Sequence, residues 1–292
     1  MTETILAARN LGKSFDSKPV LNDISASVAA GSVVGVLGKN GAGKTTLLEI
    51  ALGFSPVTSG SIKLWGHESL SLPSSVKGRI GYVPQQDELI SMISGTQQIA
   101  LNAALHKNWD QELIAKLAQE WEVPLNRRIS ALSGGERQKI SVLLALGHRP
   151  DLLVLDEPLA SLDPVARRQF LSQLLEITAD QTRAVVFSSH IISDLERVAN
   201  EVWILRQGNM AWQGDLDVLK ESVVRLHLQA RDKLPESLAI AHTLHEQVDG
   251  NTATISVSSW SSDAAAPLAE RLGVEVDVEP LDLEEIFLEM HR

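Results

Sequence analysis

The sequence contains no cysteine in its 292 residues. The chain therefore forms no disulfide bond and offers no thiolate ligand to a metal ion or an iron–sulfur cluster. It also lacks any run approaching the roughly 20 apolar residues that a membrane-spanning helix needs. Residues 1–4 carry neither the basic flank nor the apolar stretch of a signal peptide. Together these absences favour a protein of the cytoplasm.

Positive charge is scarce as well. There are 26 lysines and arginines against 37 aspartates and glutamates, which gives a formal net charge of −11. Nucleic-acid binding needs a basic face, and the nearest approach to a basic cluster is Arg137, Lys139 and Arg149. We therefore expect no nucleic-acid partner.

A glycine-rich segment beginning at Gly38 has the pattern G-x-x-x-x-G-K-[ST] of a phosphate-binding loop. Its glycines let successive backbone N–H groups turn toward phosphates, Lys44 adds a positive charge, and the Thr45 hydroxyl is a ligand for Mg²⁺. The alternative is a chance glycine-rich turn. A buried strand expected at residues 32–37 and a helix expected at residues 45–50 argue against that alternative. The residues predicted to bind the triphosphate are Gly38, Lys39, Asn40, Gly41, Ala42, Gly43, Lys44, Thr45 and Thr46.

Two more motifs follow far downstream. Leu132-Ser133-Gly134-Gly135-Glu136 precedes an amphipathic helix that is expected to end near residue 146, and an apolar strand at residues 152–155 ends in two carboxylates. With these motifs the chain resembles the ATP-binding subunit of an ABC transporter over about residues 3–218. The order of the motifs supports the resemblance: phosphate loop, Gln85, the L-S-G-G-E segment, Asp156-Glu157, Asp163 and His190.

The resemblance implies an α/β fold, a P-loop NTPase domain of the ABC ATPase type. Such a domain has a parallel sheet core, an antiparallel β subdomain and a helical subdomain. The sequence pattern agrees with this, because short alternating runs near the N-terminus predict antiparallel strands and residues 95–146 have helical spacing. A later alternation of strands and helices predicts a parallel sheet. The expected strands are 5–8, 21–28, 61–64, 80–83, 152–156, 184–188 and 202–205, with helices at 164–178 and 191–199.

The character of the sequence changes near residue 222. We predict an ABC-type ATP-binding domain at residues 1–221 and a small α+β domain at residues 222–292. The end of the chain, residues 283–288, resembles the tail of ATPases in the export branch of ABC transporters. Strands are expected in this region at 223–228, 252–257 and 274–278, and helices at 235–244, 262–272 and from 283 onward.

Asp156 and Glu157 follow a buried strand, and ligand sites in α/β folds lie at the carboxyl ends of such strands. The resemblance implies that Asp156 holds Mg²⁺ through its water shell and that Glu157 polarises the attacking water. Adjacent residues on a strand point to opposite sides, so two separate roles are geometrically natural. The alternative is an acidic strand end without catalytic function, and the phosphate loop makes that alternative unattractive.

Three single residues are assigned through the same resemblance. His190 should reach the γ-phosphate, although a lone histidine is usually a surface or core residue. Gln85 should contact Mg²⁺ and the water; Gln86 is the alternative, and Gln85 is preferred because it directly follows a proline. Phe15 lies where an aromatic ring stacks on adenine, and core packing is its alternative role.

The segment Ser133, Gly134, Gly135 and Glu136, called here the signature segment, opens a helix whose N–H groups suit an anion. In the family it contacts the γ-phosphate bound to a second subunit, and Asp163 acts across the same seam. We therefore expect these residues to complete the ATP site of a partner chain. Glu136 replaces the commoner glutamine. Its carboxylate would repel a triphosphate unless it were turned outward, so we expect a modest effect on affinity and no loss of activity.

The resemblance thus predicts an ATPase coupled to transmembrane transport, with ATP and Mg²⁺ as cofactors. The partners expected are integral membrane transport subunits and a second ATP-binding subunit, most simply a homodimer. The location expected is the cytoplasmic face of the cell membrane, as a peripheral protein, and the tail favours export of a lipid, peptide or drug-like molecule. The alternative is a soluble ABC-type ATPase with non-membrane partners, such as in iron–sulfur cluster assembly. The predicted catalytic residues are Glu157, His190 and Gln85, and the predicted metal-site residues are Thr45, Gln85 and Asp156.

Overall fold

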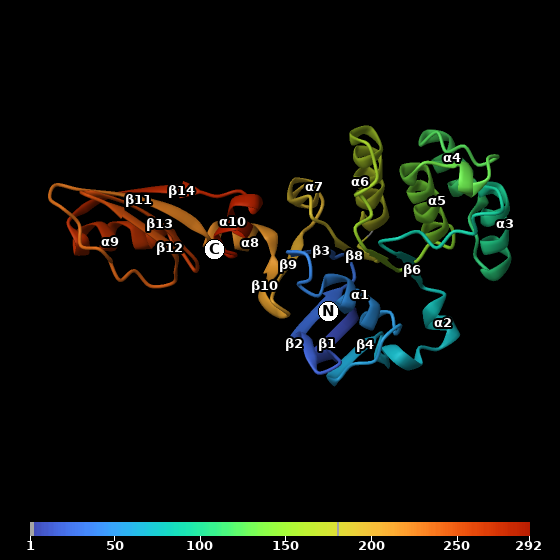
Figure 1. Ribbon diagram of the computed structural model, residues 1–292, viewed down its shortest axis with the longest axis horizontal. Helices are drawn as coiled ribbons and strands as arrows, with labels where there is room; N and C mark the ends of the chain where they lie inside the picture. Colours follow the sequence, from blue (N-terminus) through green and yellow to red (C-terminus); the bar gives the residue numbers. More distant parts are fainter. Residues whose placement is uncertain (1–2, 180) are drawn as a thin grey trace. The chain divides into compact units, whose positions relative to one another are not determined.

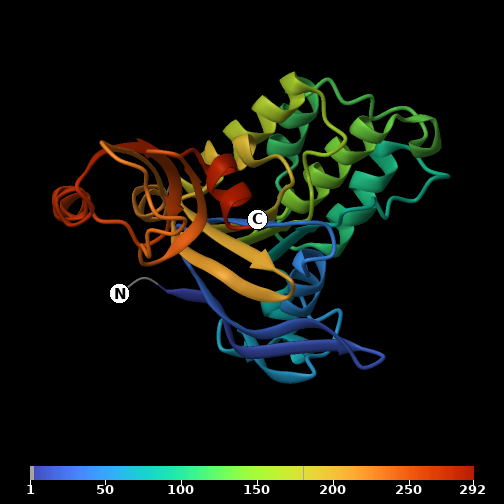
Figure 2. The same cartoon turned by 60° about the vertical axis from the view of Figure 1, so that its left-hand side comes forward.

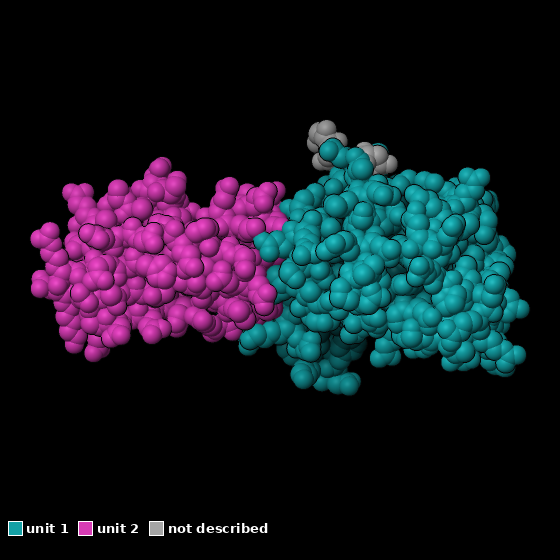
Figure 3. Space-filling view, turned by 90° about the horizontal axis from the view of Figure 1, so that it is seen from above, with its two compact units in different colours: residues 1–213 teal, residues 214–292 magenta. Residues whose placement is uncertain are grey.

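The computed structural model describes residues 3–179 and 181–292. The chain divides into two compact units, residues 1–213 and 214–292 (Figures 1 and 3). The boundary predicted from the sequence lies at residue 221, at the end of helix α8 (Leu216–Ser222), which the division places in the second unit.

The core of the first unit is a six-stranded sheet with the order β10-β9-β3-β8-β7-β6. Its central pairs β9·β3, β3·β8, β8·β7 and β7·β6 are all parallel, so the carboxyl ends of β3, β8 and β7 meet at one edge. Nearly all side chains of these three strands are buried, as expected for a parallel sheet covered on both faces. The strands are β3 (Val33–Gly38), β6 (Ile80–Val83), β7 (Leu152–Leu155), β8 (Ala184–Ser188), β9 (Glu201–Arg206) and β10 (Asn209–Asp215).

A second, antiparallel sheet in the first unit has the order β2-β1-β4-β5. Ala7 is paired with Ser27 on one side and with Lys63 on the other, which fixes the register of the three long strands. Apolar residues of these strands form one core cluster with β3 and helix α1 (Lys44–Ala51). The strands are β1 (Thr4–Phe15), β2 (Lys18–Ala29), β4 (Ser59–Leu64) and β5 (His67–Glu68).

Helices cover the parallel sheet on the side opposite to the antiparallel sheet (Figures 1 and 2). Three of them, α3, α4 and α5, gather into a helical region between β6 and β7 in the chain, as predicted. Asp163 caps α6, and Ser133 caps α5. Besides α1, the helices of this unit are α2 (Ser74–Lys77), α3 (Gly95–Leu105), α4 (Gln111–Glu120), α5 (Gly134–Leu146), α6 (Pro164–Thr178) and α7 (Ile192–Glu196), with short 3₁₀ turns at Ser69–Ser71 and Ile129–Ala131. The predicted fold class is confirmed.

The second unit is a small α+β structure with its own apolar core. Its four strands pair antiparallel in the order β12-β13-β11-β14. Arg225 on β11 forms ion pairs with Glu279, Glu285 and Glu289, which join β11 to β14 and to the last helix. The elements are α8, β11 (Val224–Ala230), β12 (Thr243–Asp249), β13 (Thr252–Val257), a 3₁₀ turn (Ser262–Ala264), α9 (Ala265–Leu272), β14 (Val274–Pro280) and α10 (Leu283–Glu289).

One predicted element of this unit is wrong. Residues 235–244 do not form a helix; they form an irregular segment that leads into strand β12. Leu238 is buried, but its backbone N–H donates to the carboxylate of Glu246 (2.7 Å) instead of to a helical carbonyl. Ala239 and His242 have φ values of +49° and +58°, which no right-handed helix contains. Leu238 therefore packs into the apolar core of this unit from a segment of irregular backbone.

Candidate nucleotide-binding site

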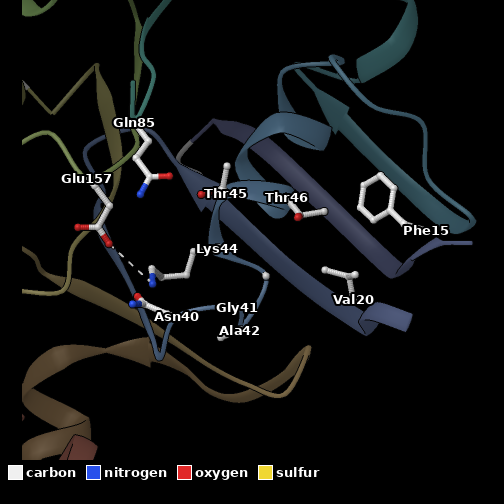
Figure 4. A pocket seen from close by; sticks show the side chains of 11 residues that line it. Phe15, Val20, Asn40, Gly41, Ala42, Lys44, Thr45, Thr46, Gln85 and Glu157 are labelled. Carbon is white, nitrogen blue, oxygen red and sulfur yellow. Dashed lines mark ion pairs between the residues drawn. The ribbon is translucent and has the colours of Figure 1, made fainter. Parts of the chain in front are cut away.

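A cavity of about 440 Å³ lies at the carboxyl edge of β3, beside the phosphate loop (Figure 4). One end is formed by Phe15 and Val20 from the antiparallel sheet, and the other by Gln85 and Glu157. The loop lines the space between these ends. The lining residues are Phe15, Val20, Asn40, Gly41, Ala42, Gly43, Lys44, Thr45, Thr46, Gln85 and Glu157. Gly38 and Lys39, also predicted to bind phosphate, precede this lining in the chain.

The loop owes its shape to its glycines. Gly43 has φ +104°, and a Cβ atom there would lie 2.6 Å from Cδ2 of Leu21, so only glycine fits. Helix α1 begins at the next residue, which places its N-terminal N–H groups at the cavity. Lys44 is buried, and its Nζ donates a hydrogen bond to the carbonyl of Gly38 (2.8 Å). The loop thus offers N–H groups and one ammonium group to an anion.

Asp156 directly follows β7 and is fully buried. Its Oδ1 accepts a hydrogen bond from the hydroxyl of Ser188 (2.5 Å), whereas its buried Oδ2 has no hydrogen-bond partner among the described residues. A buried carboxylate oxygen without a donor is costly unless a cation or its water shell meets it. Carboxylate, hydroxyl and amide oxygens are the ligands that Mg²⁺ prefers. The side chains of Asp156, Thr45 and Gln85 therefore fit a hydrated Mg²⁺ ion.

Glu157 lies at the junction of three groups. Its Oε1 is 3.7 Å from Nζ of Lys44, and its Oε2 accepts hydrogen bonds from Nδ1 (2.6 Å) and the backbone N–H (3.1 Å) of His190. Its own backbone N–H donates to the Ser188 hydroxyl (2.8 Å). Glu157 has φ +50°, a left-handed conformation that is uncommon outside glycine and is concentrated at functional sites. The backbone turn directs the carboxylate into the cavity instead of along the strand.

His190 reaches the site through Glu157. Because a carboxylate only accepts, Nδ1 carries the proton and Nε2 is the free ring nitrogen. The side chain is 56% exposed and does not line the cavity. The structure thus places His190 beside Glu157, where it holds the carboxylate.

Gln85 and Phe15 both line the cavity, from opposite ends (Figure 4). Gln86 does not line it, which supports the choice of Gln85 over its neighbour. Phe15 is 47% exposed, which argues against the core-packing alternative. Nζ of Lys13 lies 4.5 Å from the Phe15 ring centroid.

The signature segment does not line this cavity. Ser133 and Glu136 form a reciprocal cap, in which the Ser133 N–H donates to Oε2 of Glu136 (2.7 Å) and the Glu136 N–H donates to the Ser133 hydroxyl (3.2 Å). The hydrogen bond that the Ser133 backbone N–H donates to the carboxylate lowers the pKa of Glu136. The Glu136 carboxylate is thus turned back onto the end of its own helix, which is the orientation that avoids the repulsion from a triphosphate considered above. Asp163 likewise caps α6 through the N–H groups of Val165 and Ala166.

Comparison with known proteins agrees with this geometry. Residues 21–160 match the family model described as ABC transporter. The Nod factor export ATP-binding protein I of Burkholderia lata is 30% identical over 292 residues, which cover 97% of this chain and 95% of that protein. This chain belongs to the ABC transporter ATP-binding proteins. YxlF, an uncharacterised ABC transporter ATP-binding protein of Bacillus subtilis, is 33% identical over 74% of this chain and 73% of its own length.

Solved structures support the same assignment. An ATP binding subunit of an ABC transporter superimposes with a TM-score of 0.67 and 26% identity, over 73% of this chain and 90% of that one. A bacterial Atm1-family ABC exporter shares the fold with a TM-score of 0.65, over 74% of this chain and 40% of the exporter, at 24% identity. As a member of this family, the chain binds ATP, and its hydrolysis of ATP is coupled to transport.

Two residues of this ABC ATPase site were missed from the sequence. Ser188 bridges Asp156 and Glu157, and Val20 lines the cavity beside Phe15. The available signal for Ser188 was its place at the end of a strand, two residues before His190. No local signal marked Val20, which reaches the cavity because β2 packs next to the loop.

We predict that Glu157→Gln lowers ATP turnover by at least about 100-fold, because it removes the base but preserves the size of the side chain. ATP affinity should change little, since the loop and Lys44 are unaltered. Steady-state turnover and equilibrium binding of ATP measure the two effects. Glu176→Gln, on the exposed side of α6, is the matched control. Normal turnover in the Glu157 variant would contradict the assignment.

We also predict that Ser188→Ala raises the Mg²⁺ concentration needed for half-maximal turnover by about 10-fold or more, since groups that orient metal ligands have effects of this size. The variant leaves Oδ1 of Asp156 without its donor. A Mg²⁺ titration of the ATPase rate tests this. The control is Ser141→Ala, because Ser141 is also buried but its hydroxyl has no partner among the described residues. An unchanged Mg²⁺ requirement would show that Ser188 does not support Asp156 as a metal ligand.

Proposed function

We propose that two copies of this chain close around two ATP molecules and drive export through separate membrane subunits. The observation that carries this proposal is the separation of the site into two parts. One chain gathers the phosphate loop, Gln85 and Glu157 around a single cavity, yet its signature segment lies outside that cavity. A second chain would supply the missing part.

The roles of the residues follow from their positions. Phe15 and Val20 would receive the adenine, since they form the apolar end of the cavity. The loop N–H groups and Lys44 would hold the β- and γ-phosphates. Thr45, Gln85 and Asp156 would hold Mg²⁺, which when bound neutralises negative charge on the phosphates.

Hydrolysis requires a base for the attacking water. Glu157 is the acceptor at the phosphate end of the cavity, and its bonds to His190 leave the carboxylate in one fixed orientation. Lys44 would exchange its contact with Glu157 for phosphate oxygens, which frees one carboxylate oxygen for the water. His190 is thus a positioning residue in this arrangement, because its Nδ1–H and its backbone N–H hold the Glu157 carboxylate.

The signature segment is suited to a nucleotide bound by another chain. Ser133 and Gly134 are exposed, and they open the 13-residue helix α5, whose N-terminus favours an anion. Gly134 and Gly135 have no side chain to keep a phosphate at a distance. Gly135 also packs closely on the chain, because a Cβ atom there would lie 2.7 Å from the carbonyl oxygen of Ser161.

We predict that Ser133→Arg reduces hydrolysis by at least about 100-fold, the usual cost of losing a transition-state donor, and leaves ATP binding to the same chain intact. The substitution places a long cation where the partner's phosphate would lie. Turnover and ATP affinity are measured side by side, with Ser172→Arg on the exposed face of α6 as the control. Full turnover with arginine at position 133 would exclude a site shared between chains.

Membrane subunits are the proposed recipients of the closing motion. Among residues 3–179 and 181–292, no helix is both long and apolar enough to cross a bilayer. Four large apolar side chains are exposed on α3 and in the segment just before it, and they are candidates to be covered by a partner. They are Ile90, Met92, Leu101 and Leu105. A peripheral position at the cytoplasmic face of the membrane follows from this partnership.

Export of a lipid, peptide or drug-like molecule is supported by the relatives. The alignment with the Nod factor export protein spans 97% of this chain, so it extends into the second unit as well as the ATPase. The resemblance of residues 283–288 to the tails of export ATPases points the same way. The cargo contacts would belong to the membrane subunits.

We predict that the tagged chain, extracted gently from its native membranes, co-purifies with a polytopic membrane protein identifiable by mass spectrometry. A variant with Met92→Ser and Leu105→Ser should recover less of that partner if the exposed apolar side chains form the contact. Leu175→Ser, an exposed apolar position on α6, is the control. Recovery of soluble partners alone would replace this proposal with that of an assembly ATPase.

A further inference from the structure

The second unit contains a cavity of about 340 Å³ that has no part in the ATP site. It lies between the irregular segment before β12, the end of β13 and the first turns of α9. Its walls are largely apolar, with Val257 and Leu268 buried and Trp260 half-buried. Concave, mostly apolar spaces with a few polar groups are typical small-molecule sites.

The charge at this cavity is positive. Arg271 is the one lining residue with a permanent charge, and no aspartate or glutamate lines the cavity, although the chain has a net charge of −11. Asp263 and Glu270 lie on the same segments but are outside the lining. The Arg271 side chain is exposed, and the described part of the chain offers it no hydrogen bond or ion pair.

Most of the remaining polar side chains can donate hydrogen bonds to a ligand, whereas the Ser258 hydroxyl already donates to the carbonyl of His242 (3.3 Å). His242, Ser258, Ser259 and Ser261 line the cavity, together with the indole of Trp260. The half-buried Trp260 makes no hydrogen bond through its indole N–H to residues 3–179 or 181–292. A guanidinium with several neutral donors around it is suited to a carboxylate.

The walls are fixed by the backbone. The N–H of Ser258 donates to the carbonyl of His242 (2.9 Å), and the N–H of Trp260 donates to the carbonyl of Ser222 (2.8 Å). His242 and Ser259 both have positive φ, +58° and +57°. These bonds tie the segment after β13 to the segment before β12 and to the end of α8, which fixes the backbone around the cavity.

We propose that this cavity binds a small amphipathic carboxylate, with an aryl or alkyl body against Val257, Trp260 and Leu268 and its anionic group at Arg271. The ligand class follows from the apolar walls and the single positive charge. This site is independent of the nucleotide site and adds a second ligand to the protein. It gives the C-terminal unit a binding function of its own.

Phenylbutyrate tests the proposal, with phenylbutylamine as the probe of equal shape and opposite charge. Binding to the full chain is measured by calorimetry and by tryptophan fluorescence, with saturating ATP present to occupy the other cavity. Phenylbutyrate should bind at least about tenfold more tightly than the amine, a difference of about 1.4 kcal/mol. Equal affinities, or no binding of phenylbutyrate up to about 10 mM, would overturn the proposal.

Two variants locate the site. Arg271→Gln should raise the Kd for phenylbutyrate about tenfold. Arg231→Gln, which removes an exposed arginine of the same unit outside the cavity, should leave the Kd unchanged. Trp260→Phe should abolish most of the fluorescence response while calorimetry still detects binding. Equal effects of the two arginine variants, or a full fluorescence response without Trp260, would place the ligand elsewhere and refute the assignment.

Discussion

The site depends on the parallel insertion of β8 between β3 and β7. This pairing brings the phosphate loop after β3, the carboxylates after β7 and Ser188 at the end of β8 to one edge of the sheet. Ser188 then bonds to Asp156 and to the backbone of Glu157 at once. Because Asp156 is fully buried, its ionised form is tolerable only where donors and a cation can meet it. The fold thus leaves Oδ2 of Asp156 without a partner among the described residues, at the same sheet edge as the phosphate loop.

A second constraint concerns the signature segment, for which we propose a role in the ATP site of another chain. Within one chain, Ser133 and Glu136 satisfy each other in the cap of α5, and Asp163 is the cap of α6. Both helix N-termini are thus capped within the chain, and their first residues remain exposed. Glu136 accordingly stabilises the helix and does not need to touch the phosphates. A role in another chain would explain why the signature segment does not line the nucleotide cavity of its own chain.

Much of this could be predicted from the sequence, because the informative signals are local. The strand at Ala184–Ser188 and the helix at Pro164–Thr178 have the bounds that their patterns indicated, and the motif residues follow the strands that carry them. The predictions failed where contacts between distant parts of the chain determine the backbone conformation or the role of a residue. Leu238 lies in a segment predicted to be helical, but its backbone N–H is held by Glu246. The role of Ser188 depends on the pairing of β8 with β7, which the residues around Ser188 do not reveal. The cavity beside Trp260 could not be predicted either, because three segments that are separate in the sequence line it.

The most direct test of the shared site uses the absence of cysteine from the chain. One preparation carries Ser133→Cys and a second carries Asn40→Cys, and the two are mixed, given Mg-ATP and mildly oxidised. We predict a disulfide-linked dimer that contains one copy of each variant and that forms only with nucleotide. In the proposed dimer, position 133 of one chain would face the phosphate loop of the other. Absence of this cross-linked species, while both variants bind ATP, would contradict it.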